Sequence, residues 1–523
     1  MLLSELIESI GDLAEVRVVR GDAAAVRVAD LTDDSRTVVP GSLFVARQGV
    51  DFDGKAFIAD AIAAGASVVL ADDEAAAADL PDNIAGLYAP DARLVSALMA
   101  ERVFGSPSSS LLVAAVTCTN GKTTVSHIVH RLLNRCGLRC GLIGTVEIDD
   151  GTERVVSEAT TPGSIELSRT LATMVEAGCR AVVLEASSQG LDQRRVDGVA
   201  IDAAVFTNLS GDHLDYHKTL DAYRDAKARL FELVDPDGLR VTNTDDDVGR
   251  TIAGQNAVRC SMTGGDWTVR TRSADLESMR LELRGPAWSI ESRVELIGQH
   301  NAMNTLQAVV VCDEFLRRVG VDSVAERAAR IGRALSLLGP PRGRLEPVHD
   351  ARDDVKVFVD FAHTDDALAK ALESINELVG VRKTWAVFGA GGDKDRSKRP
   401  RMGAVAARLA GRVVVTSDNP RTEKPSAIIT EVLSGIDDER RVDGSVSVQA
   451  DRAVAIAHAI RSAEPGDAVV IAGKGHETEQ ILPNPSGSGV QVQRFDDREE
   501  ARKALAARRE RTQRVGEAGA VAG

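Results

Sequence analysis

Short runs of apolar, mostly β-branched residues alternate along the chain with Ala-rich segments whose apolar positions recur at helical spacing. Residues 43–72, LFVARQGVDFDGKAFIADAIAAGASVVLAD, show this alternation, and it predicts an α/β unit. The small-residue segment SPSSS at 106–110 interrupts the pattern and is typical of a linker. We therefore expect a first α/β domain over residues 1–110.

A second group of apolar runs begins at residue 111. LLVAAVTCTNGKTTVSHIVHRLLNRCG predicts a strand, a small-residue turn and a helix, and AVVLEAS (181–187) and AAVFTNLS (203–210) predict further buried strands. Strands that are apolar throughout and separated by helices favour a mostly parallel sheet covered on both faces. LLGPPRG at 337–343 ends the pattern, so we expect a central domain over residues 111–340.

Four strand-and-turn units follow, spaced by Ala-rich helical segments. They are VKVFVDFAH (355–363), TWAVFGAGGD (384–393), RVVVTSDNP (412–420) and DAVVIAGKGH (467–476). Each apolar run ends in a polar, Gly-rich or Asp-rich turn, which is typical of a doubly wound, Rossmann-like α/β domain that binds ligands at the carboxyl ends of its strands. We expect this third domain over residues 341–507 and a disordered tail over 508–523.

Length, composition and charge narrow the classes of function. The chain has 523 residues, 44% hydrophobic and 3% aromatic, and a formal net charge of −15. It is too long for one hydrophobic core, since such cores stop growing near about 250 to 300 residues. Because Lys and Arg form no long basic stripe, a nucleic-acid partner is not expected.

The N-terminal segment, the length of the apolar runs and the spacing of the cysteines predict where the protein is located and whether it contains disulfides or metal-bound cysteines. The first residues, MLLSELIESIGDLAEV, predict a short acidic amphipathic helix rather than a signal peptide. No apolar run reaches the roughly 18 to 20 residues that cross a bilayer, so we expect a cytoplasmic protein without membrane insertion. The six cysteines form no CxxC pair and have no His at zinc spacing, which favours small buried residues over disulfides or metal ligands.

The turn after the first central strand has the features of a phosphate-binding loop. VTCTNGKTT (116–124) places Gly121 and Lys122 at a strand-to-helix turn, where free backbone N–H groups and the helix dipole can hold a polyphosphate. Lys122 would neutralise the β- and γ-phosphates, and the Thr123 hydroxyl would bind Mg²⁺. The alternative is an ordinary strand-turn-helix with a surface lysine. The apolar strand and helix on either side favour the phosphate loop.

Three other segments carry candidate acidic or metal-binding side chains. Glu185 ends a predicted strand, where a metal beside the phosphates would need an oxygen ligand, although a solvated loop would have the same sequence. NLSGDHLDYH (208–217) packs two Asp and two His into six residues, which fits either a metal site or a surface cluster. Lys227 lies on a predicted helix over 221–232 and by itself is typical of an amphipathic surface lysine.

The order of these motifs resembles that of the Mur ligase family. The matching segments are TNGKTT (119–124), EASS (185–188), NLSGDHLDYH (208–217), YRDAKARLF (223–231), GQHNAMN (298–304), GRLE (343–346), VDFAHT (359–364), DNPR (418–421) and GKGHE (473–477). They follow the family's order and span nearly the whole chain. The resemblance is greatest to the members that add the third amino acid to the peptidoglycan precursor.

The resemblance implies an ATP-dependent acid–amino-acid ligase with Mg²⁺ as cofactor and small molecules as substrates, and we expect a monomer. In that family ATP phosphorylates a terminal carboxylate, and an amine attacks the acyl phosphate. The residues that would bind ATP are Thr119, Asn120, Gly121, Lys122, Thr123, Thr124, His300, Asn301, Asn304, Arg344 and Asp360. The catalytic residues would be Lys122, Glu185, His213 and Lys227, and the metal ligands Thr123, Glu185, His213 and a carbamylated Lys227.

The resemblance also assigns both acceptor substrates. The residues that would contact the UDP-N-acetylmuramoyl dipeptide are Ser35, Arg36, Glu158, Thr160, Thr161, Ser187, Gln193 and Arg195. Those that would bind the incoming amino acid are Lys394, Asp418, Asn419, Arg421, Gly473 and Glu477. DNPR matches members that select meso-diaminopimelate, whose distal carboxylate can pair with Arg421 and whose distal ammonium can pair with Glu477. Lysine would place a cation opposite Arg421, which is costly in a closed pocket.

The chain departs from the family's pattern at five positions. They are Cys118 for a usual Gly, Gln189 for a His, Gly211 for an Arg, Asp365 for a Pro and Lys394 for an Arg. A Cβ at position 118 would crowd the phosphates and weaken ATP binding. The alternatives are a lysine-adding ligase, a folylpolyglutamate synthase, a non-catalytic paralogue and a phosphate-loop kinase. DDSR (33–36) with DNPR disfavours the first two, the intact motif residues disfavour the third, and GKGHE disfavours the fourth.

Overall fold

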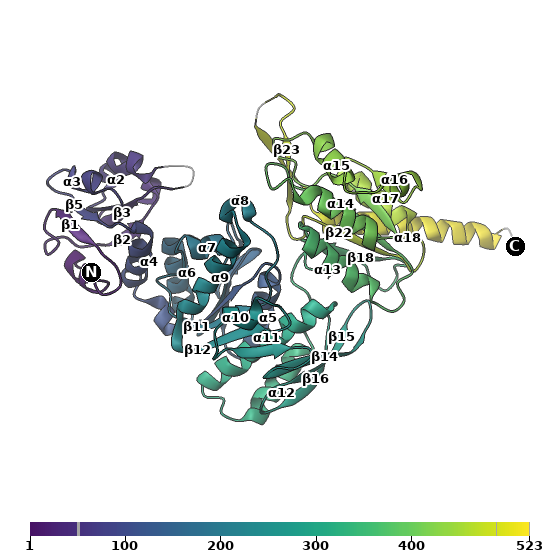
Figure 1. Cartoon of the computed structure of the whole chain (residues 1–523), viewed down its shortest axis with the longest axis horizontal. Coiled ribbons are helices and arrows are strands. Elements are labelled where there is room, and N and C mark those ends of the chain that lie inside the picture. The colour runs from purple at the N-terminus through teal and green to yellow at the C-terminus, as the bar shows by residue number, and fades with distance from the viewer. Residues whose placement is uncertain (50–52, 488, 522–523) are drawn as a thin grey trace.

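The computed structural model of the chain describes residues 1–49, 53–487 and 489–521, with side chains described as far as residue 514. The chain forms three α/β domains, in agreement with the predicted fold class. In Figure 1 they follow one another from the N-terminal domain through the central domain to the C-terminal domain. Within the described residues, no helix is both long enough and apolar enough to span a membrane.

The N-terminal domain is built on a five-stranded sheet of order β1-β5-β4-β3-β2, in which only the β1–β5 pair is antiparallel. Its strands are β1 (Arg17–Arg20), β2 (Asp30–Thr32), β3 (Ser42–Ala46), β4 (Val68–Ala71) and β5 (Ala85–Tyr88). Its helices are α1 (Leu3–Glu8), α2 (Ile58–Ala64), α3 (Glu74–Ala78) and α4 (Ala92–Val103), with 3₁₀ turns at Ser35–Thr37, Gly54–Phe57 and Pro107–Ser110. Every residue of β3 and β4 is buried, because helices cover both faces of the sheet.

The central domain contains an eleven-stranded sheet of order β16-β15-β14-β13-β12-β11-β6-β10-β7-β8-β9. The strands are β6 (Leu112–Thr117), β7 (Cys140–Ile143), β8 (Glu147–Asp149), β9 (Arg154–Val156), β10 (Ala181–Glu185), β11 (Ile201–Phe206), β12 (Val234–Asn243), β13 (Val258–Ser261), β14 (Trp267–Ala274), β15 (Met279–Arg284) and β16 (Ser289–Val294). The middle of the sheet is parallel, as the sequence predicts, whereas β14–β16 and β7–β9 extend it with antiparallel pairs.

Helices cover both faces of this central sheet. They are α5 (Lys122–Arg135), α6 (Ser164–Glu176), α7 (Ser188–Asp192), α8 (Leu214–His217), α9 (Leu220–Glu232), α10 (Gly249–Ile252), α11 (Gln299–Arg318) and α12 (Val324–Leu335). Strand β6 shows how the two cores are divided: Ala114 and Val116 join the core under α5 and α11, and Val113 and Ala115 join the core under α6 and α9. All six cysteines of the chain are free and buried, as predicted.

The C-terminal domain has a six-stranded sheet of order β17-β18-β22-β19-β20-β21, parallel except for β17. The strands are β17 (Glu346–Pro347), β18 (Lys356–Asp360), β19 (Thr384–Phe388), β20 (Arg412–Val415), β21 (Val446–Val448) and β22 (Ala468–Ala472), and a separate hairpin consists of β23 (Glu479–Pro483) and β24 (Val490–Arg494). The helices are α13 (Asp365–Asn376), α14 (Lys398–Leu409), α15 (Pro425–Leu433), α16 (Asp438–Val442), α17 (Arg452–Ser462) and α18 (Asp497–Val521). Four of the sheet's strands are the predicted strand-and-turn units.

The expected disorder is not found over residues 508–521, because α18 continues to Val521, and residues 522–523 lie outside the described part of the chain. Its ordered part is anchored beyond residue 507: Arg508 donates to both carboxylate oxygens of Asp354, at 2.7 and 2.9 Å, and to the carbonyl of Ala463. Arg509 pairs with Asp350. These cations bind carboxylates and a carbonyl next to α17, whereas the sequence alone shows only a charged, Ala-rich terminus. Figure 1 shows the end of α18 extending away from the domain.

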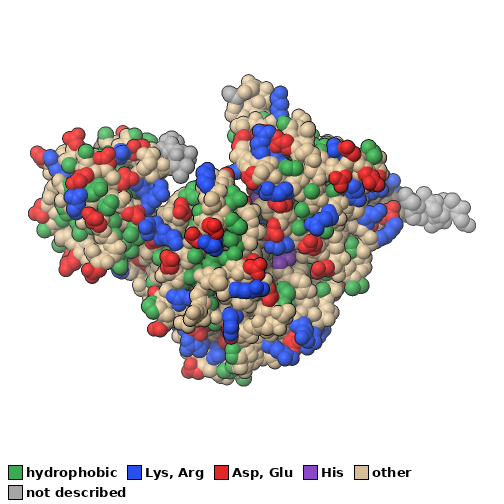
Figure 2. All heavy atoms as spheres, in the orientation of Figure 1, with side chains coloured by type: hydrophobic (Ala, Val, Ile, Leu, Met, Phe, Trp, Pro, Cys, Tyr) green, Lys and Arg blue, Asp and Glu red, His purple; other side chains and the backbone are tan. Residues whose placement is uncertain are grey.

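Figure 2 shows a hollow between the N-terminal and C-terminal domains, above the central domain. On this face Lys and Arg side chains are interspersed with Asp and Glu over all three domains. The carboxyl ends of the central parallel strands and of the C-terminal strand β18 supply the residues of one cavity, described next.

Candidate active site

The turn between β6 and α5 is a phosphate-loop structure at which glycine is required. Gly121 has φ of 108°, and a Cβ at this position would lie 2.9 Å from Oδ1 of Asn304 on α11. The loop is held from the end of β11: the backbone N–H of Asn120 donates to Oδ1 of Asn208, and the Thr207 hydroxyl donates to the Asn120 carbonyl at 2.6 Å. The first turn of α5 is therefore presented to the cavity with its backbone N–H groups free for an anion.

Two lysines meet at the base of this loop. Lys122 Nζ donates to the carbonyl oxygen of Cys118 at 2.8 Å, and Lys227 Nζ donates to the same oxygen at 2.7 Å. Lys227 comes from α9 and is 1% exposed, so it is not the surface lysine that its helix alone suggests. Burial, reinforced by the neighbouring Lys122 charge, lowers the pKa of Lys227 well below its usual value. Burial therefore favours the neutral amine of Lys227 over its ammonium form.

The side chain of Cys118 is completely buried. The residues that line the cavity begin at Thr119, and Cys118 is not among them. The thiol of Cys118 therefore lies outside the cavity, and the loop turns the Cys118 carbonyl toward the two lysines.

Glu185, at the end of β10, is the buried acid beside the phosphate loop. It is 1% exposed. Its carboxylate accepts hydrogen bonds from the hydroxyl of Thr123 at 3.1 Å and from the backbone N–H and hydroxyl of Thr145 at 3.0 and 2.8 Å. Arg344 reaches the same point from the C-terminal domain and donates to the Thr123 hydroxyl at 2.9 Å. A hydroxyl, a carboxylate and a guanidinium therefore converge where a phosphate and its metal would bind.

His213 lies at the other side of the cavity, with φ of 53° and a half-exposed side chain. Its Nε2 is 3.6 Å from Asp212, and its ring lies 6.2 Å from that of Tyr223. Partial desolvation in the cavity lowers the pKa of His213, which favours the neutral imidazole whose nitrogen lone pair can bind a metal. Within the described residues, no three His, Cys, Asp or Glu side chains are grouped closely enough to hold a metal by themselves.

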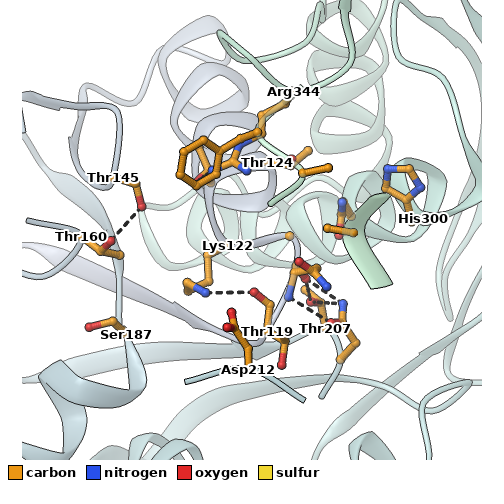
Figure 3. A pocket seen from close by; sticks show the side chains of 18 of the residues that line it. Thr119, Lys122, Thr124, Thr145, Thr160, Ser187, Thr207, Asp212, His300 and Arg344 are labelled. Carbon is orange, nitrogen blue, oxygen red and sulfur yellow. Dashed lines mark hydrogen bonds between the residues drawn. The ribbon is translucent and has the colours of Figure 1, made fainter. Parts of the chain in front are cut away.

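The cavity has a volume of about 540 Å³, which is within the range of small-molecule sites. Figure 3 shows Arg344, Thr124 and His300 on one side of it and Ser187 and Thr160 on the other, with Lys122 between them. It is closed in part by the C-terminal domain, because Asp366 of α13 accepts from the side chains of Asn120 at 2.7 Å and Ser210 at 2.9 Å. The C-terminal domain thus contacts the phosphate loop directly.

The structure brings most of the expected nucleotide and peptide residues together. The cavity is lined by Thr119, Asn120, Gly121, Lys122, Thr123, Thr124, Thr160, Thr161, Ser187, Arg195, His213, Lys227, His300, Asn301, Asn304, Arg344 and Asp360. Glu185 is not in the lining but contacts Thr123 from behind. Ser35, Arg36, Glu158 and Gln193, and the six residues expected to bind the amino acid, are also outside the lining.

The expected dipeptide residues form a chain of contacts leading away from Glu185. The Thr161 hydroxyl donates to the Glu185 carbonyl at 2.7 Å and lies 3.0 Å from the Ser187 hydroxyl. Arg195 donates to the Thr161 carbonyl at 2.6 Å and to Oε1 of Gln193. Arg36, in the N-terminal domain, instead pairs with its neighbour Asp34 and is exposed.

The residues expected to bind the amino acid lie on three loops, at the carboxyl ends of β19, β20 and β22. Asn419 donates to Oε2 of Glu477 at 2.8 Å. Arg421 has φ of 52°, its backbone N–H donates to the Ile481 carbonyl of the β23–β24 hairpin, and its side chain donates to the carbonyl of Gly392 at 2.8 Å. Asp418 is 7% exposed and its Oδ1 has no hydrogen-bond partner among the described residues.

Sequence reasoning missed several residues of the cavity. Asn208 and Thr207 hold the phosphate loop, Thr145 holds Glu185, and Asp366 links the domains. The only available signal was the polar end of the predicted strand at 203–210. Thr145 and Asp366 carry no such signal, since their roles depend on which loops and domains meet.

Three family models match the chain. "Mur ligase family, catalytic domain" matches residues 28–102, "Mur ligase middle domain" matches 116–312, and "Mur ligase, glutamate ligase domain" matches 343–475. Among curated proteins, UDP-N-acetylmuramoyl-L-alanyl-D-glutamate–2,6-diaminopimelate ligase of Pseudomonas aeruginosa is 42% identical over 490 residues, covering 92% of this chain and 95% of that protein. The enzyme of the same name from Chlorobaculum tepidum is 38% identical over 511 residues, covering 95% and 96%.

Two solved structures are similar over most of their length. A structure of UDP-N-acetylmuramoyl-L-alanyl-D-glutamate–2,6-diaminopimelate ligase has a TM-score of 0.64 and 31% identity, and covers 93% of this chain and 96% of that one. The MurF ligase of Thermotoga maritima, solved in complex with ADP, has a TM-score of 0.61 and 18% identity, and covers 93% and 99%. The second likeness shows a shared fold alone.

Proposed function

This chain belongs to the Mur ligase family, and from that premise we propose that it joins 2,6-diaminopimelate to UDP-N-acetylmuramoyl-L-alanyl-D-glutamate at the expense of ATP, in peptidoglycan synthesis. Relatives of that name are 38% and 42% identical over more than nine-tenths of the chain. The observation that carries the proposal is one cavity lined by the phosphate loop and the buried Lys227, with the buried Glu185 held against Thr123 directly behind it. Because the substrates are a nucleotide and a nucleotide-linked peptide, the protein would act in the cytoplasm.

The phosphate loop would bind the polyphosphate of ATP. The N-terminal turn of α5 supplies backbone N–H groups, and Lys122 supplies a positive charge. His300, Asn301 and Asn304 line the cavity where α11 begins. Arg344 and Asp360 line the same cavity from the C-terminal domain. Contacts from two domains mean that closure of the C-terminal domain completes the site and excludes water from a reactive acyl phosphate.

The residues present fit magnesium. Thr123 and Glu185 offer a hydroxyl and a carboxylate 3.1 Å apart, which are the hard oxygen ligands that Mg²⁺ prefers. His213 offers a neutral nitrogen across the cavity. When bound, the metal would neutralise charge on the phosphates and so lower the repulsion that an attacking carboxylate meets. The Thr145 hydrogen bonds to Glu185 would keep that carboxylate oriented.

Lys227 has the chemistry that carbamylation requires. Only a neutral amine attacks carbon dioxide, and burial next to Lys122 lowers the pKa of Lys227 and so favours its neutral amine. The product is an anion, for which Lys122 is a suitable partner because both lysines already bind the Cys118 carbonyl. A carbamate at this position would supply a second oxygen ligand for magnesium opposite Glu185.

The dipeptide would reach the cavity from the hollow between the domains. Thr160, Thr161, Ser187 and Arg195 line the side of the cavity away from the nucleotide. Arg195 is suited to hold a carboxylate or a phosphate because its planar guanidinium can make two parallel hydrogen bonds. Held there, the terminal carboxylate would face the γ-phosphate, form the acyl phosphate and release ADP, and the incoming amine would then displace phosphate.

The incoming amino acid would bind at the loops of Asn419, Arg421 and Glu477. Arg421 would pair with the distal carboxylate of diaminopimelate and Glu477 with its distal ammonium. Lys394 would meet the remaining carboxylate as a point charge. Lysine lacks the distal carboxylate and would leave Arg421 facing a cation, so we propose selection of diaminopimelate over lysine.

The test is to supply the purified protein with ATP, Mg²⁺ and UDP-N-acetylmuramoyl-L-alanyl-D-glutamate, together with either diaminopimelate or lysine. ADP release and the mass of the nucleotide-linked product are measured. We expect one ADP per tripeptide formed, and faster tripeptide formation with diaminopimelate. Release of ADP without tripeptide from either amino acid would refute the ligase assignment. Faster turnover with lysine would refute the proposed selectivity alone.

A further inference from the structure

A completely buried lysine lies within one of the loops proposed to bind the amino acid. Lys474, directly after β22, is 0% exposed. Its Nζ donates to Oε2 of Glu477 at 2.8 Å and to Oδ1 of Asn419 at 3.0 Å. Because it is buried, its ammonium acts on a bound amino acid only through Glu477 and Asn419.

The contacts of Lys474 fix one oxygen of Glu477 and leave the other available. Oε2 accepts from both Lys474 and the Asn419 side-chain amide, which is 2.8 Å away. Within the part of the chain that the structure describes, Oε1 accepts no hydrogen bond, and a third of the Glu477 side chain remains exposed. Lys474 also fixes the orientation of the Asn419 amide, because its ammonium binds the carbonyl oxygen and so turns the NH₂ group toward Glu477.

We propose that Lys474 is a specificity-determining residue, which makes the pocket favour an amino acid with a distal ammonium and carboxylate over one with a distal ammonium alone. This inference rests on the proposed function. Without Lys474, Glu477 would present an uncompensated negative charge, which attracts any cationic side chain. With Lys474, the Lys474–Glu477 pair is neutral overall, so Glu477 no longer offsets the attraction of Arg421 for a carboxylate.

The sign of the effect follows from the charges of the two amino acids. The field of a fixed cation repels a distal ammonium in both ligands, but attracts only the distal carboxylate of diaminopimelate. For diaminopimelate the two contributions oppose each other, whereas for lysine the repulsion stands alone. Removal of the Lys474 charge should therefore improve the use of lysine relative to diaminopimelate. Because Lys474 and Asn419 are buried, the interaction of the Lys474 charge with a nearby ligand is stronger than it would be in water.

The side-chain exposure of Glu477 distinguishes a role of Lys474 in ligand selection from simple support of the fold. A buried ion pair is weak evidence for stability, since the cost of desolvation offsets the attraction. The neighbouring pair Arg452–Asp497 is 0% exposed at both side chains, as expected for a pair that only supports the domain. In the Lys474–Glu477 pair one partner is buried and the other reaches solvent, which is the arrangement of a side chain oriented for a ligand.

The experiment compares Lys474→Met with the wild type in the complete ligase assay. The quantity measured is the ratio of kcat/KM for lysine to kcat/KM for diaminopimelate, which does not depend on the fraction of enzyme that is folded. We expect this ratio to rise about tenfold or more in Lys474→Met. Adding Glu477→Gln to Lys474→Met should reverse the rise, because the anion that attracts lysine is then gone.

Lys424→Met is the matched control, since Lys424 is an exposed lysine at the start of α15 in the same domain. Its ratio should equal that of the wild type, because solvent screens an exposed charge. An equal loss of kcat/KM for both amino acids in Lys474→Met would overturn the inference and leave only a structural role. A wild type that forms tripeptide from neither amino acid would overturn the proposed function and this inference with it.

Discussion

Lys227→Met should inactivate the protein and stabilise it at the same time. The amine of Lys227 is completely buried beside Lys122, and burial lowers its pKa well below 10.5. Between the lowered pKa and 10.5 the unfolded chain binds a proton that the folded chain does not. The free energy of unfolding therefore rises with pH in this window, by about 1.4 kcal/mol per unit. A neutral thioether of similar length would remove this cost.

The substitution also has costs, which set the size of the effect. The hydrogen bond from Lys227 to the Cys118 carbonyl is lost, and this is worth about 1 kcal/mol. Fitting Met in place of the lysine stem costs less than about 1.5 kcal/mol. Because each pH unit between the lowered pKa and 10.5 adds about 1.4 kcal/mol to the gain, and burial lowers the pKa of Lys227 well below 10.5, we expect Lys227→Met to be more stable than the wild type at pH 7. That advantage should shrink steadily toward pH 10.

The assay is thermal and urea unfolding of both proteins from pH 7 to 9 in bicarbonate-free buffer, so that Lys227 carries no carbamate. Ligase activity is measured in parallel, and it should fall at least about 100-fold, as for loss of a metal-binding group. Lys474→Met provides the contrast, because it removes a buried lysine that has a carboxylate partner and should be destabilising. A stability difference that does not change with pH, or a less stable Lys227→Met at every pH, would refute the reasoning.

Three further predictions concern the same cavity. Glu185→Gln keeps the shape of the side chain but removes its charge, and should lower kcat by about 10²- to 10³-fold with little change in the melting temperature; unchanged kcat would exclude Glu185 from the reaction. Cys118→Gly should change the KM for ATP less than about threefold, a difference near the size of RT, because the thiol is buried away from the cavity; a tenfold lower KM would show that the Cβ does crowd the phosphates. Asp366→Ala removes the acceptor shared by Asn120 and Ser210, and should increase the radius of gyration measured by small-angle X-ray scattering without nucleotide; an unchanged radius would show that other contacts hold the domains.

The fold class and the strand-and-turn units could be predicted because they depend on local periodicity. The apolar runs at 112–117, 181–185 and 201–206 are strands of one parallel sheet. The antiparallel additions β14–β16 and the helical end of α18 could not be predicted. They depend on what a strand edge or a charged helix meets elsewhere, such as Asp354 for Arg508.

The residues of the candidate site likewise fall into those that the sequence predicts and those that only the tertiary structure reveals. The phosphate loop is predictable because its function depends on adjacent residues, with Gly121 at positive φ between a strand and a helix. Lys227 is not, since its helix alone indicates a surface lysine, and only the packing of α9 against the β6–α5 loop buries it beside Lys122. The roles proposed for the more distant residues rested on the family resemblance rather than on the residues themselves.

The sequence by itself determined which segments are strands, helices and phosphate-binding turns, because those properties arise from neighbours along the chain. The tertiary structure alone decided which charges are buried and which face each other. Burial favours the neutral amine of Lys227 and encloses Lys474 behind Glu477. The physical reason is that desolvation and Coulomb interactions depend on distance in space and on the surrounding medium, neither of which is encoded in the identity of a single residue.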